Sequence, residues 1–473
     1  MDLDVSSVYF YGVLTYLLML VGVAFYLSKR VHSQADFAVA GRNLPSFVVF
    51  GTLVATWMGS GSLFGHSEKA YNSGLVITLM LLADVLGFGL LYLLAGKVRR
   101  MQELTLQDLL EKRYNRWVRL FGSIALIIAY TTIVSYQFRA AGSVLNLIKP
   151  SISVGNATLM AAVFIMLFTV TAGLLSVAYT DVIQGVTMIV GVFIAVPILV
   201  SKAGGMGEIM AQLPQSYFNP FHDFSFTAFL GLFLPAFLLL LGDANMYQRF
   251  FAARSEGSAK KAVSFVIVGI LAVELAIIFM AMIGQVLEPG LANPGKVIAV
   301  LAIKHVPMIL GVIMITVIAA VVVSTGDSYL LSPATSFARD IYQSFLRPQA
   351  SEKEMLLVSR ASVIVLGLIA LGLTQLSDQF LAVALYAYTI YGASITPALM
   401  AALFWKRATT AGALGSIIGG TVTTLLWEMV DHSFQIDAVI PAITVSLTLL
   451  IGLSLATPKQ GIDKLKPFGL DQA

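Results

Sequence analysis

Long apolar runs follow one another along nearly the whole chain, and short polar or Gly/Pro-containing segments separate them. An apolar run of about 20 residues is long enough to cross the hydrocarbon core of a bilayer as an α-helix. The polar connections are too short to build a soluble core of their own. The pattern therefore predicts an all-α polytopic membrane protein with about thirteen transmembrane helices, at residues 8–28, 44–66, 75–96, 119–147, 157–174, 180–201, 226–248, 262–287, 308–338, 357–375, 380–404, 411–427 and 437–457.

Composition supports this assignment. Of the 473 residues, 58% are hydrophobic and only 11% are charged, whereas an average soluble domain carries about 25% charged residues. Most soluble enzymes are excluded on this ground. The chain has no cysteine, so disulfides and thiolate metal sites are excluded as well.

The positions of the basic residues predict an orientation. With the N-terminus outside, most of the 29 Lys and Arg residues, Arg249 among them, fall on the cytoplasmic side, and only Lys69, Lys149, Lys202, Lys296 and Lys304 fall outside. Such a bias over short loops is the positive-inside pattern. We expect a multi-pass protein of the plasma (inner) membrane with a cytoplasmic C-terminus. The formal net charge of +4 then needs no nucleic-acid partner.

Six charged residues are expected inside the spans: Asp84, Arg139, Asp181, Asp243, Glu274 and Asp327. Charges at this depth are costly, and each is a candidate functional residue. Glu274 and Asp84 stand among apolar neighbours, which favours a structural role for both. Asp327 belongs to the segment VVVSTGDSYLLS, where the adjacent hydroxyls of Ser324 and Thr325 offer oxygen ligands suited to Na⁺. The alternative is that these hydroxyls only bond to carbonyls of their own helix.

Two spans contain residues that break a helix. The first is ATWMGSGSLFG, residues 55–65, whose three glycines each cost about 1 kcal/mol of helix stability relative to alanine. The second is LLLLGDANMYQRF, with Gly242, Asp243 and Asn245. Each break begins a set of five spans, 44–201 and 226–404, and an odd number of spans makes the two halves inverted repeats. Paired broken helices in inverted halves mark the central site of a transporter; close packing through small residues is the alternative.

Four segments resemble the sodium/solute symporter family, whose fold is the five-plus-five inverted repeat of the LeuT type: AGRNLPSFVVFGTLVATWMGSGSLFG, GLLSVAYTDVIQG, GDANMYQRFFAARS and VSTGDSYLLSPATSFARDIYQ. The resemblance covers residues 8 to 457. It implies a leading helix and cytoplasmic loop in 1–43, a first repeat in 44–202, a second in 203–405, and two trailing helices with a cytoplasmic tail in 406–473.

The resemblance also implies a sodium site. Its ligands in this chain are the backbone carbonyls of Ala55, Met58 and Val321 and the hydroxyls of Ser324 and Thr325. Asp181, together with Ser328, lies where some members hold a second sodium. Those members can offer another hydroxyl at the position of Val321, which has none. Asp181 is therefore expected either to hold a second ion, to tune the first site, or to bond to the adjoining helix.

The motifs are most similar to the choline-transporting branch of the family. Trp57 would supply one wall of the aromatic cage that a quaternary ammonium needs, but Ile133 and Asp243 stand where that branch carries tryptophans, which argues against choline. Arg139 is expected to bind a solute carboxylate or to pair with Asp243 or Asp84. If Arg139 and Asp243 both line the cavity, they suit a zwitterion. The other candidate solute ligands are Trp57, Ser62, Tyr136, Gln137 and Tyr247.

These observations predict a Na⁺-coupled secondary active symporter that imports a small organic solute by alternating access, with an amino acid or carboxylate favoured. The alternatives are a transporter-like sensor with a separate signalling partner and an H⁺-coupled transporter. An enzyme is not expected, because the five histidines show no ligand spacing and no nucleophile–base pair is visible. Gly415 and Gly419 permit helix contact, but no oligomer is required.

Overall fold

The fold is entirely helical over the part of the chain that a computed structural model describes, residues 5–29, 31, 33–222, 225–377, 379–427, 429 and 436–471. Within these residues 12 helices are long and apolar enough to cross a membrane. One of them, Gly61–Met101, has 41 residues. It follows the shorter apolar helix Ser46–Trp57 after a break. Together these two helices account for the expected spans 44–66 and 75–96, so the polytopic all-α class is confirmed.

The α-helices in chain order are α1 (Val5–Ser28), α2 (Gln34–Val39), α3 (Ser46–Trp57), α4 (Ser67–Ser73), α5 (Thr78–Met101), α6 (Leu106–Arg113), α7 (Arg116–Ile148), α8 (Val154–Lys202), α9 (Met206–Gln212), α10 (Phe226–Gly242), α11 (Ala244–Ala252), α12 (Glu256–Leu287), α13 (Val297–Lys304), α14 (Met308–Ser336), α15 (Glu352–Leu373), α16 (Phe380–Phe404), α17 (Thr410–Trp427) and α18 (Val439–Ala456). Two segments are π-helices: η2 (Gly61–His66) and η6 (Phe337–Leu346). Helix η2 leads directly into α4, and η6 follows directly after α14. Short 3₁₀ turns are η1 (Ala40–Arg42), η3 (Gly74–Ile77), η4 (Gln215–Phe218), η5 (Pro294–Lys296), η7 (Ile462–Lys464) and η8 (Lys466–Phe468).

Both predicted helix breaks are present. Helix α3 ends at Trp57, and Met58 leaves the helical region with φ −84° and ψ 73° before the chain resumes in η2. Helix α10 ends at Gly242, and Asp243, with φ −60° and ψ 114°, separates it from α11. Each break interrupts the first helix of one proposed repeat, as expected for paired broken helices.

The long run α8 is two helices joined at Gly173. It spans 49 residues, and Gly173 has φ 60° and ψ 172°, a conformation that other residues rarely adopt. A Cβ atom at this position would also lie 2.9 Å from Cδ2 of Phe37. The kink therefore separates the expected fourth and fifth spans of the first repeat, and it depends on glycine.

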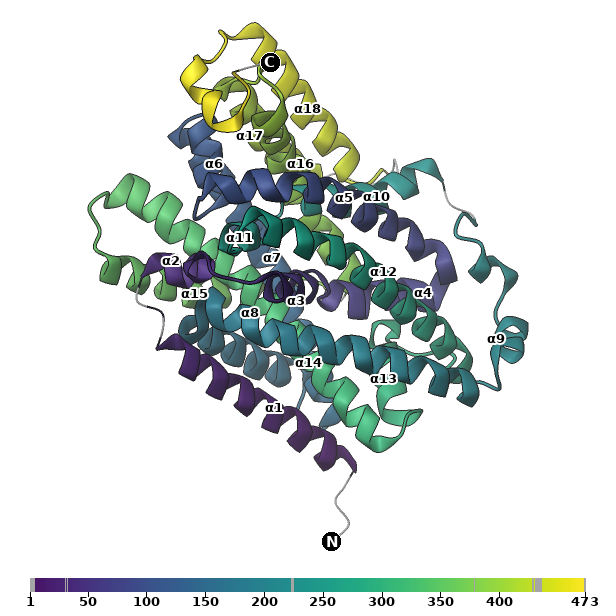
Figure 1. The fold of residues 1–473 in the computed structure, drawn as a ribbon. Helices are drawn as coiled ribbons and strands as arrows, with labels where there is room; N and C mark the ends of the chain where they lie inside the picture. Colours follow the sequence, from purple (N-terminus) through teal and green to yellow (C-terminus); the bar gives the residue numbers. More distant parts are fainter. Residues whose placement is uncertain are drawn as a thin grey trace.

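The broken helix α3 lies near the centre of the bundle. It packs against α8, α12 and α14, while α14 also packs against α7 and α8. Helix α1 lies at the lower edge of Figure 1, and the paired helices α17 and α18 lie at the top against α16. The elements that carry the expected ion ligands, α3 and α14, are thus held in contact by their neighbours.

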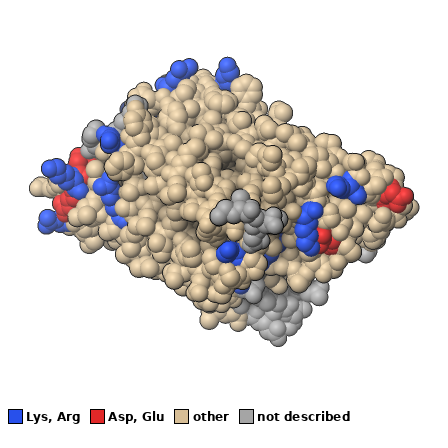
Figure 2. Space-filling view, turned by 90° about the horizontal axis from the view of Figure 1, so that it is seen from below, with Lys and Arg blue, Asp and Glu red and all other residues tan. Residues whose placement is uncertain are grey.

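One end of the bundle is tied together by two buried arginines, Arg113 and Arg119. Arg119 of α7 donates to Asp340 of η6 at 2.8 Å and pairs with Asp108 of α6 at 2.8 Å. Arg113 donates to the carbonyls of Trp405 and Ala408, which precede α17. In Figure 2 the charged residues lie mostly toward the left and right ends of the visible face and at its upper edge, and most of the surface between them is uncharged. This distribution suits a protein whose middle faces lipid.

Candidate functional site

Polar side chains of α14 meet the broken end of α3. The Thr325 hydroxyl donates to the Ala55 carbonyl at 3.1 Å, which joins two residues 270 positions apart in the chain. The five predicted ion ligands, Ala55, Met58, Val321, Ser324 and Thr325, are all nearly fully buried. We call these five residues the ion site.

The break in α3 frees one of the carbonyls of the ion site. In a regular helix the Gly59 N–H would donate to the Ala55 carbonyl four residues earlier. Here it donates to the Trp57 carbonyl at 3.0 Å, so the Ala55 oxygen is available to Thr325. A carbonyl released in this way, close to a hydroxyl from a second helix, is the type of hard oxygen ligand that Na⁺ prefers. The donor chemistry of these residues therefore fits a sodium ion.

Asp181 of α8 lies beside the ion site. The hydroxyls of Ser324 and Thr52 both donate to its carboxylate. Ser328 accepts from Arg249 Nη2 at 2.8 Å and lies 3.4 Å from the Thr56 hydroxyl. The structure thus brings Asp181 and Ser328 into one polar group with Ser324.

Arg249 was expected among the basic residues on the cytoplasmic side, but the structure places its side chain inside the bundle. The structure buries it completely, with its guanidinium 3.8 Å from Asp181 and 3.0 Å from the Thr52 hydroxyl. The signal that points to it is the second break. After Asp243 the chain resumes as α11, and this places Arg249 still within the bundle.

Asp243 and Tyr247 hold the second break. The Asp243 carboxylate accepts the backbone N–H groups of Asn245 at 2.7 Å and Met246 at 3.1 Å, and thereby caps α11. It also accepts the Tyr329 hydroxyl at 2.7 Å. The Tyr247 hydroxyl donates back across the break to the Leu241 carbonyl at 3.0 Å. These contacts give both residues a structural part in the break.

Three aromatic side chains stand next to the first break, and we call them the aromatic cluster: Trp57, Tyr136 and Tyr388. The Trp57 ring stacks on that of Tyr388 at 6.5 Å between centroids, and the Tyr136 and Tyr388 hydroxyls lie 3.3 Å apart. Gln137 Oε1 accepts the Ser60 N–H at 3.2 Å. Ser62 is buried in η2, the segment that follows. All of these residues except Tyr388 and Ser60 are among the solute ligands predicted from the sequence.

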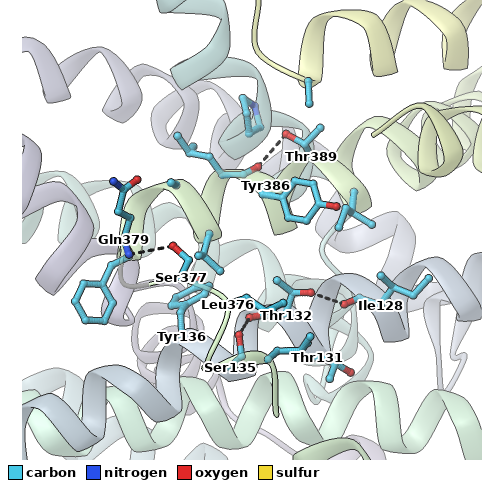
Figure 3. Close-up of a pocket in the computed structure, with 18 of the residues that line it drawn as sticks. Ile128, Thr131, Thr132, Ser135, Tyr136, Leu376, Ser377, Gln379, Tyr386 and Thr389 are labelled. Carbon is cyan, nitrogen blue, oxygen red and sulfur yellow. Dashed lines mark hydrogen bonds between the residues drawn. The ribbon is translucent and has the colours of Figure 1, made fainter. Parts of the chain in front are cut away.

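Arg139 lies elsewhere, in a cavity of about 820 Å³ that Tyr136 also lines. Figure 3 shows this cavity between α7 and the segment around α16, with Thr131, Ser135 and Tyr136 on one side and Ser377, Gln379 and Tyr386 on the other. Arg139 donates to the Thr374 carbonyl at 2.8 Å. Asp243 does not line this cavity. The two charges proposed for a zwitterion therefore do not share it.

Comparison with known proteins identifies the family of the chain. Residues 37–420 match the family described as "Sodium:solute symporter family". The chain belongs to this family. The symporter is 29% identical to the sodium/proline symporter of Haemophilus influenzae, over 98% of this chain and 96% of that protein. It is 27% identical to the high-affinity proline transporter PutP of Bacillus subtilis, over 93% of this chain and 97% of the relative.

Solved structures show the same fold. A Na⁺-coupled sialic acid symporter in a substrate-bound outward-open state superposes with a TM-score of 0.84, at 19% identity and over 96% of this chain and 99% of that one. MhsT in complex with L-phenylalanine gives a TM-score of 0.58 at 13% identity, over 90% and 98% of the two chains. The LeuT-type fold is thus confirmed, and the symporter is a Na⁺-coupled transporter of a small solute and not an enzyme.

Gly59 gives the first test of the ion site. A Cβ at Gly59 would lie 2.6 Å from Cγ2 and 2.8 Å from Oγ1 of Thr325. Gly59→Ala should therefore displace Thr325 at a cost of about 1–2 kcal/mol, which we expect to lower the apparent Na⁺ affinity for uptake by about tenfold. Gly89→Ala on α5, where no atom lies within 4 Å, is the matched control. Equal Na⁺ activation of the two variants would contradict the close approach of α3 and α14.

Proposed function

We propose that this symporter imports a small amino acid, with L-proline as the first candidate, together with Na⁺ across the plasma (inner) membrane. Two of the similar proteins carry proline in their names, and one solved structure of the same fold holds an amino acid. The observation that carries the proposal lies at the two breaks. The Ser60 hydroxyl and both amide atoms of Asn245 are buried without a hydrogen-bond partner among the described residues. Buried polar groups are normally paired, so such groups point to an absent ligand.

The aromatic cluster supplies the rest of the proposed solute site. The face of Trp57 suits the ammonium group of an amino acid, and Gln137 and Ser62 offer polar contacts beside it. Tyr136 joins this region to the cavity that contains Arg139. We therefore place Arg139 on the approach of the solute carboxylate, while Asp243 and Tyr247 shape the break without holding the solute.

The ion site acts through the contact between α3 and α14. A sodium ion held by Ala55, Met58, Val321, Ser324 and Thr325 would stabilise the break of α3, which also begins the proposed solute site. Because both ligands favour the same arrangement of these helices, each raises the affinity for the other. Asp181 lowers the electrostatic cost of a cation at this depth, and with Ser328 it remains the candidate for a second ion.

The proposed topology follows the division 1–43, 44–202, 203–405 and 406–473, with the two middle segments as inverted repeats. The contacts that tie α6, α7, η6 and the α16–α17 connection together support one common side for these basic loops. A cluster of Lys and Arg on one side is typical of the cytoplasmic face. We accordingly propose an external N-terminus and a cytoplasmic C-terminus.

Transport by the purified symporter in proteoliposomes tests the proposal. We expect an inward Na⁺ gradient, but not a K⁺ gradient, to drive uptake of radiolabelled L-proline or a close amino acid, and unlabelled solute to accelerate counterflow. Counterflow that is absent while the solute still stabilises the protein would favour the sensor alternative. Uptake driven equally by a proton gradient without Na⁺ would contradict Na⁺ coupling.

Trp57 gives a test of the solute site in the same assay. Trp57→Ala removes the aromatic face proposed for the solute ammonium, and a desolvated contact between a cation and such a ring is worth about 1–2 kcal/mol. We expect the KM for the solute to rise about tenfold, with little change in the amount of symporter that is reconstituted. Trp117→Ala, which alters an exposed tryptophan on α7, should leave the KM unchanged. An unchanged KM in Trp57→Ala would remove this residue from the solute site.

A further inference from the structure

A second group of ionisable side chains contacts the aromatic cluster through Trp57. We call it the acid–histidine cluster: His66, Asp84 and Glu274. They come from three elements, η2, α5 and α12. His66 Nδ1 lies 2.9 Å from Glu274 Oε2. Asp84 Oδ1 accepts the indole N–H of Trp57 at 3.0 Å. The cluster is therefore joined directly to one wall of the proposed solute site.

All three side chains are withdrawn from solvent. His66 is 5% exposed, Asp84 is 4% exposed and Glu274 is fully buried. One oxygen of each acid, Asp84 Oδ2 and Glu274 Oε1, is buried without a hydrogen-bond partner among the described residues. Asp84 packs against α12 beside Ile270 and Leu271, the turn that precedes Glu274. Each acid thus has one oxygen engaged and one free to carry a proton.

The charges of the cluster do not balance without an additional proton. Two carboxylates and one imidazolium sum to −1, and an uncompensated charge inside a membrane protein is costly. One more proton on either acid brings the sum to zero. Asp84 Oδ2 and Glu274 Oε1 accept no hydrogen bond from the described residues, so either oxygen can carry this proton.

We propose that His66, Asp84 and Glu274 form a buried proton-binding site whose occupancy sets the affinity of the neighbouring solute site through Trp57. In the binding step one proton passes from water to a carboxylate of Asp84 or Glu274, and no other bond forms or breaks. Nothing in this step requires Na⁺. The link to solute affinity rests on the function proposed above, whereas the proton site itself does not.

Trp57 provides the link. A hydrogen bond from its N–H to an ionised Asp84 is charge-assisted and stronger than one to the protonated acid. Ionised Asp84 therefore holds the Trp57 ring more firmly against Tyr388. We expect the solute to bind more tightly when the extra proton has left Asp84, so solute affinity should rise with pH.

Other titratable groups near the cluster come from α16, α7 and the α10–α11 break. Tyr388 of α16 is within electrostatic range of Asp84, Glu274 and Asp243. Its hydroxyl lies 3.3 Å from that of Tyr136 on α7. Among the described residues, the hydrogen bond to Asp84 comes from the indole N–H of Trp57. The variants used in the test therefore change Asp84 and Glu274 and leave the tyrosines in place.

The first experiment needs no solute. Infrared spectra of the purified full-length symporter at neutral pH should contain the carbonyl stretch of a protonated carboxylic acid. Part of this band should disappear in Asp84→Asn or in Glu274→Gln, and it should persist in Glu208→Gln, which removes an exposed acid on α9. His66→Gln provides a further variant if either of the first two fails to fold, and it should shift the band. A wild-type band in every folded cluster variant would overturn the proposal.

The second experiment measures the link to transport with L-proline as the probe, at saturating Na⁺. Wild-type affinity should rise about fivefold or more between mildly acidic and mildly alkaline pH, the usual size of such coupling. Asp84→Asn keeps an oxygen that accepts the Trp57 N–H but cannot ionise, so its affinity should not change with pH. A wild-type pH dependence in this variant would overturn the link. If the infrared band is lost in the cluster variants but the wild type does not bind proline, the proposed solute is rejected and the proton site is retained.

Discussion

The double variant Ser324→Ala and Thr325→Ala is expected to lose nearly all Na⁺-driven uptake at physiological Na⁺ concentration. The reason is that both hydroxyl ligands of the ion site come from these two adjacent residues of α14. The remaining carbonyls, of Ala55, Met58 and Val321, leave the ion with too few ligands. A hydrogen bond or ligand contact to a charged group is worth about 1.5 kcal/mol or more. Removing two such contacts should raise the Na⁺ concentration for half-maximal uptake by about 100-fold.

Uptake as a function of Na⁺ concentration in proteoliposomes measures this effect. Thr316→Ala removes a hydroxyl from the same helix about two turns nearer its start, and it should retain wild-type Na⁺ activation. The Na⁺ concentration for half-maximal uptake in each single variant should lie between the values for the wild type and the double variant. Uptake by the double variant with a wild-type Na⁺ requirement would show that the ion binds elsewhere.

Arg249→Met is expected to destabilise the symporter by about 3–5 kcal/mol, because it leaves the buried Asp181 carboxylate without its positive neighbour. Arg249 also donates to Thr52 and Ser328 and to the carbonyl of Asn245, so four elements lose a common contact. Thermal unfolding of the detergent-solubilised protein measures the change. We expect the folded fraction obtained from membranes to fall as well.

A second substitution separates charge from packing. In Arg249→Met combined with Asp181→Asn the unpaired carboxylate is gone, so a large part of the lost stability should return. Arg254→Met, at an exposed position on the same segment, should unfold like the wild type. A double variant that is no more stable than Arg249→Met would mean that the guanidinium contributes through its shape and hydrogen bonds and not through its charge.

The two helix breaks could be recognised from local sequence because their cause is local. Glycines at positions 59, 61 and 65 weaken the helical ladder wherever the segment lies, and a Gly–Asp–Ala–Asn string after a leucine run favours a helix end and a new N-cap. The structure has its breaks at Met58 and Asp243. The predicted joining of Thr325 to the α3 carbonyls is likewise present at Ala55.

Arg249 and Asp243 show where local information was insufficient. Arg249 follows an apolar run and precedes a basic loop, which is how a cytoplasmic arginine appears in a sequence, yet it lies fully buried beside Asp181. Asp243 appeared as a possible solute ligand, but three donors from α11 and α14 occupy its carboxylate. The depth of a residue in a broken helix depends on where the second half of that helix resumes. Asp181, beside Arg249, and Tyr329, which donates to Asp243, come from helices distant in the chain.

The membrane class, the approximate spans, the positions of the breaks and the residue types of the proposed sodium site all follow from the order of amino acids. Each depends on apolar length, glycine content or side-chain chemistry, which are properties of short segments. The pairing of His66 with Glu274 and of Asp84 with Trp57 does not, because each pair joins different helices. Both acids appear isolated along the chain. Packing of η2 and α5 against α12 brings them together beside the proposed solute site, because contacts between different helices form only when the helices pack.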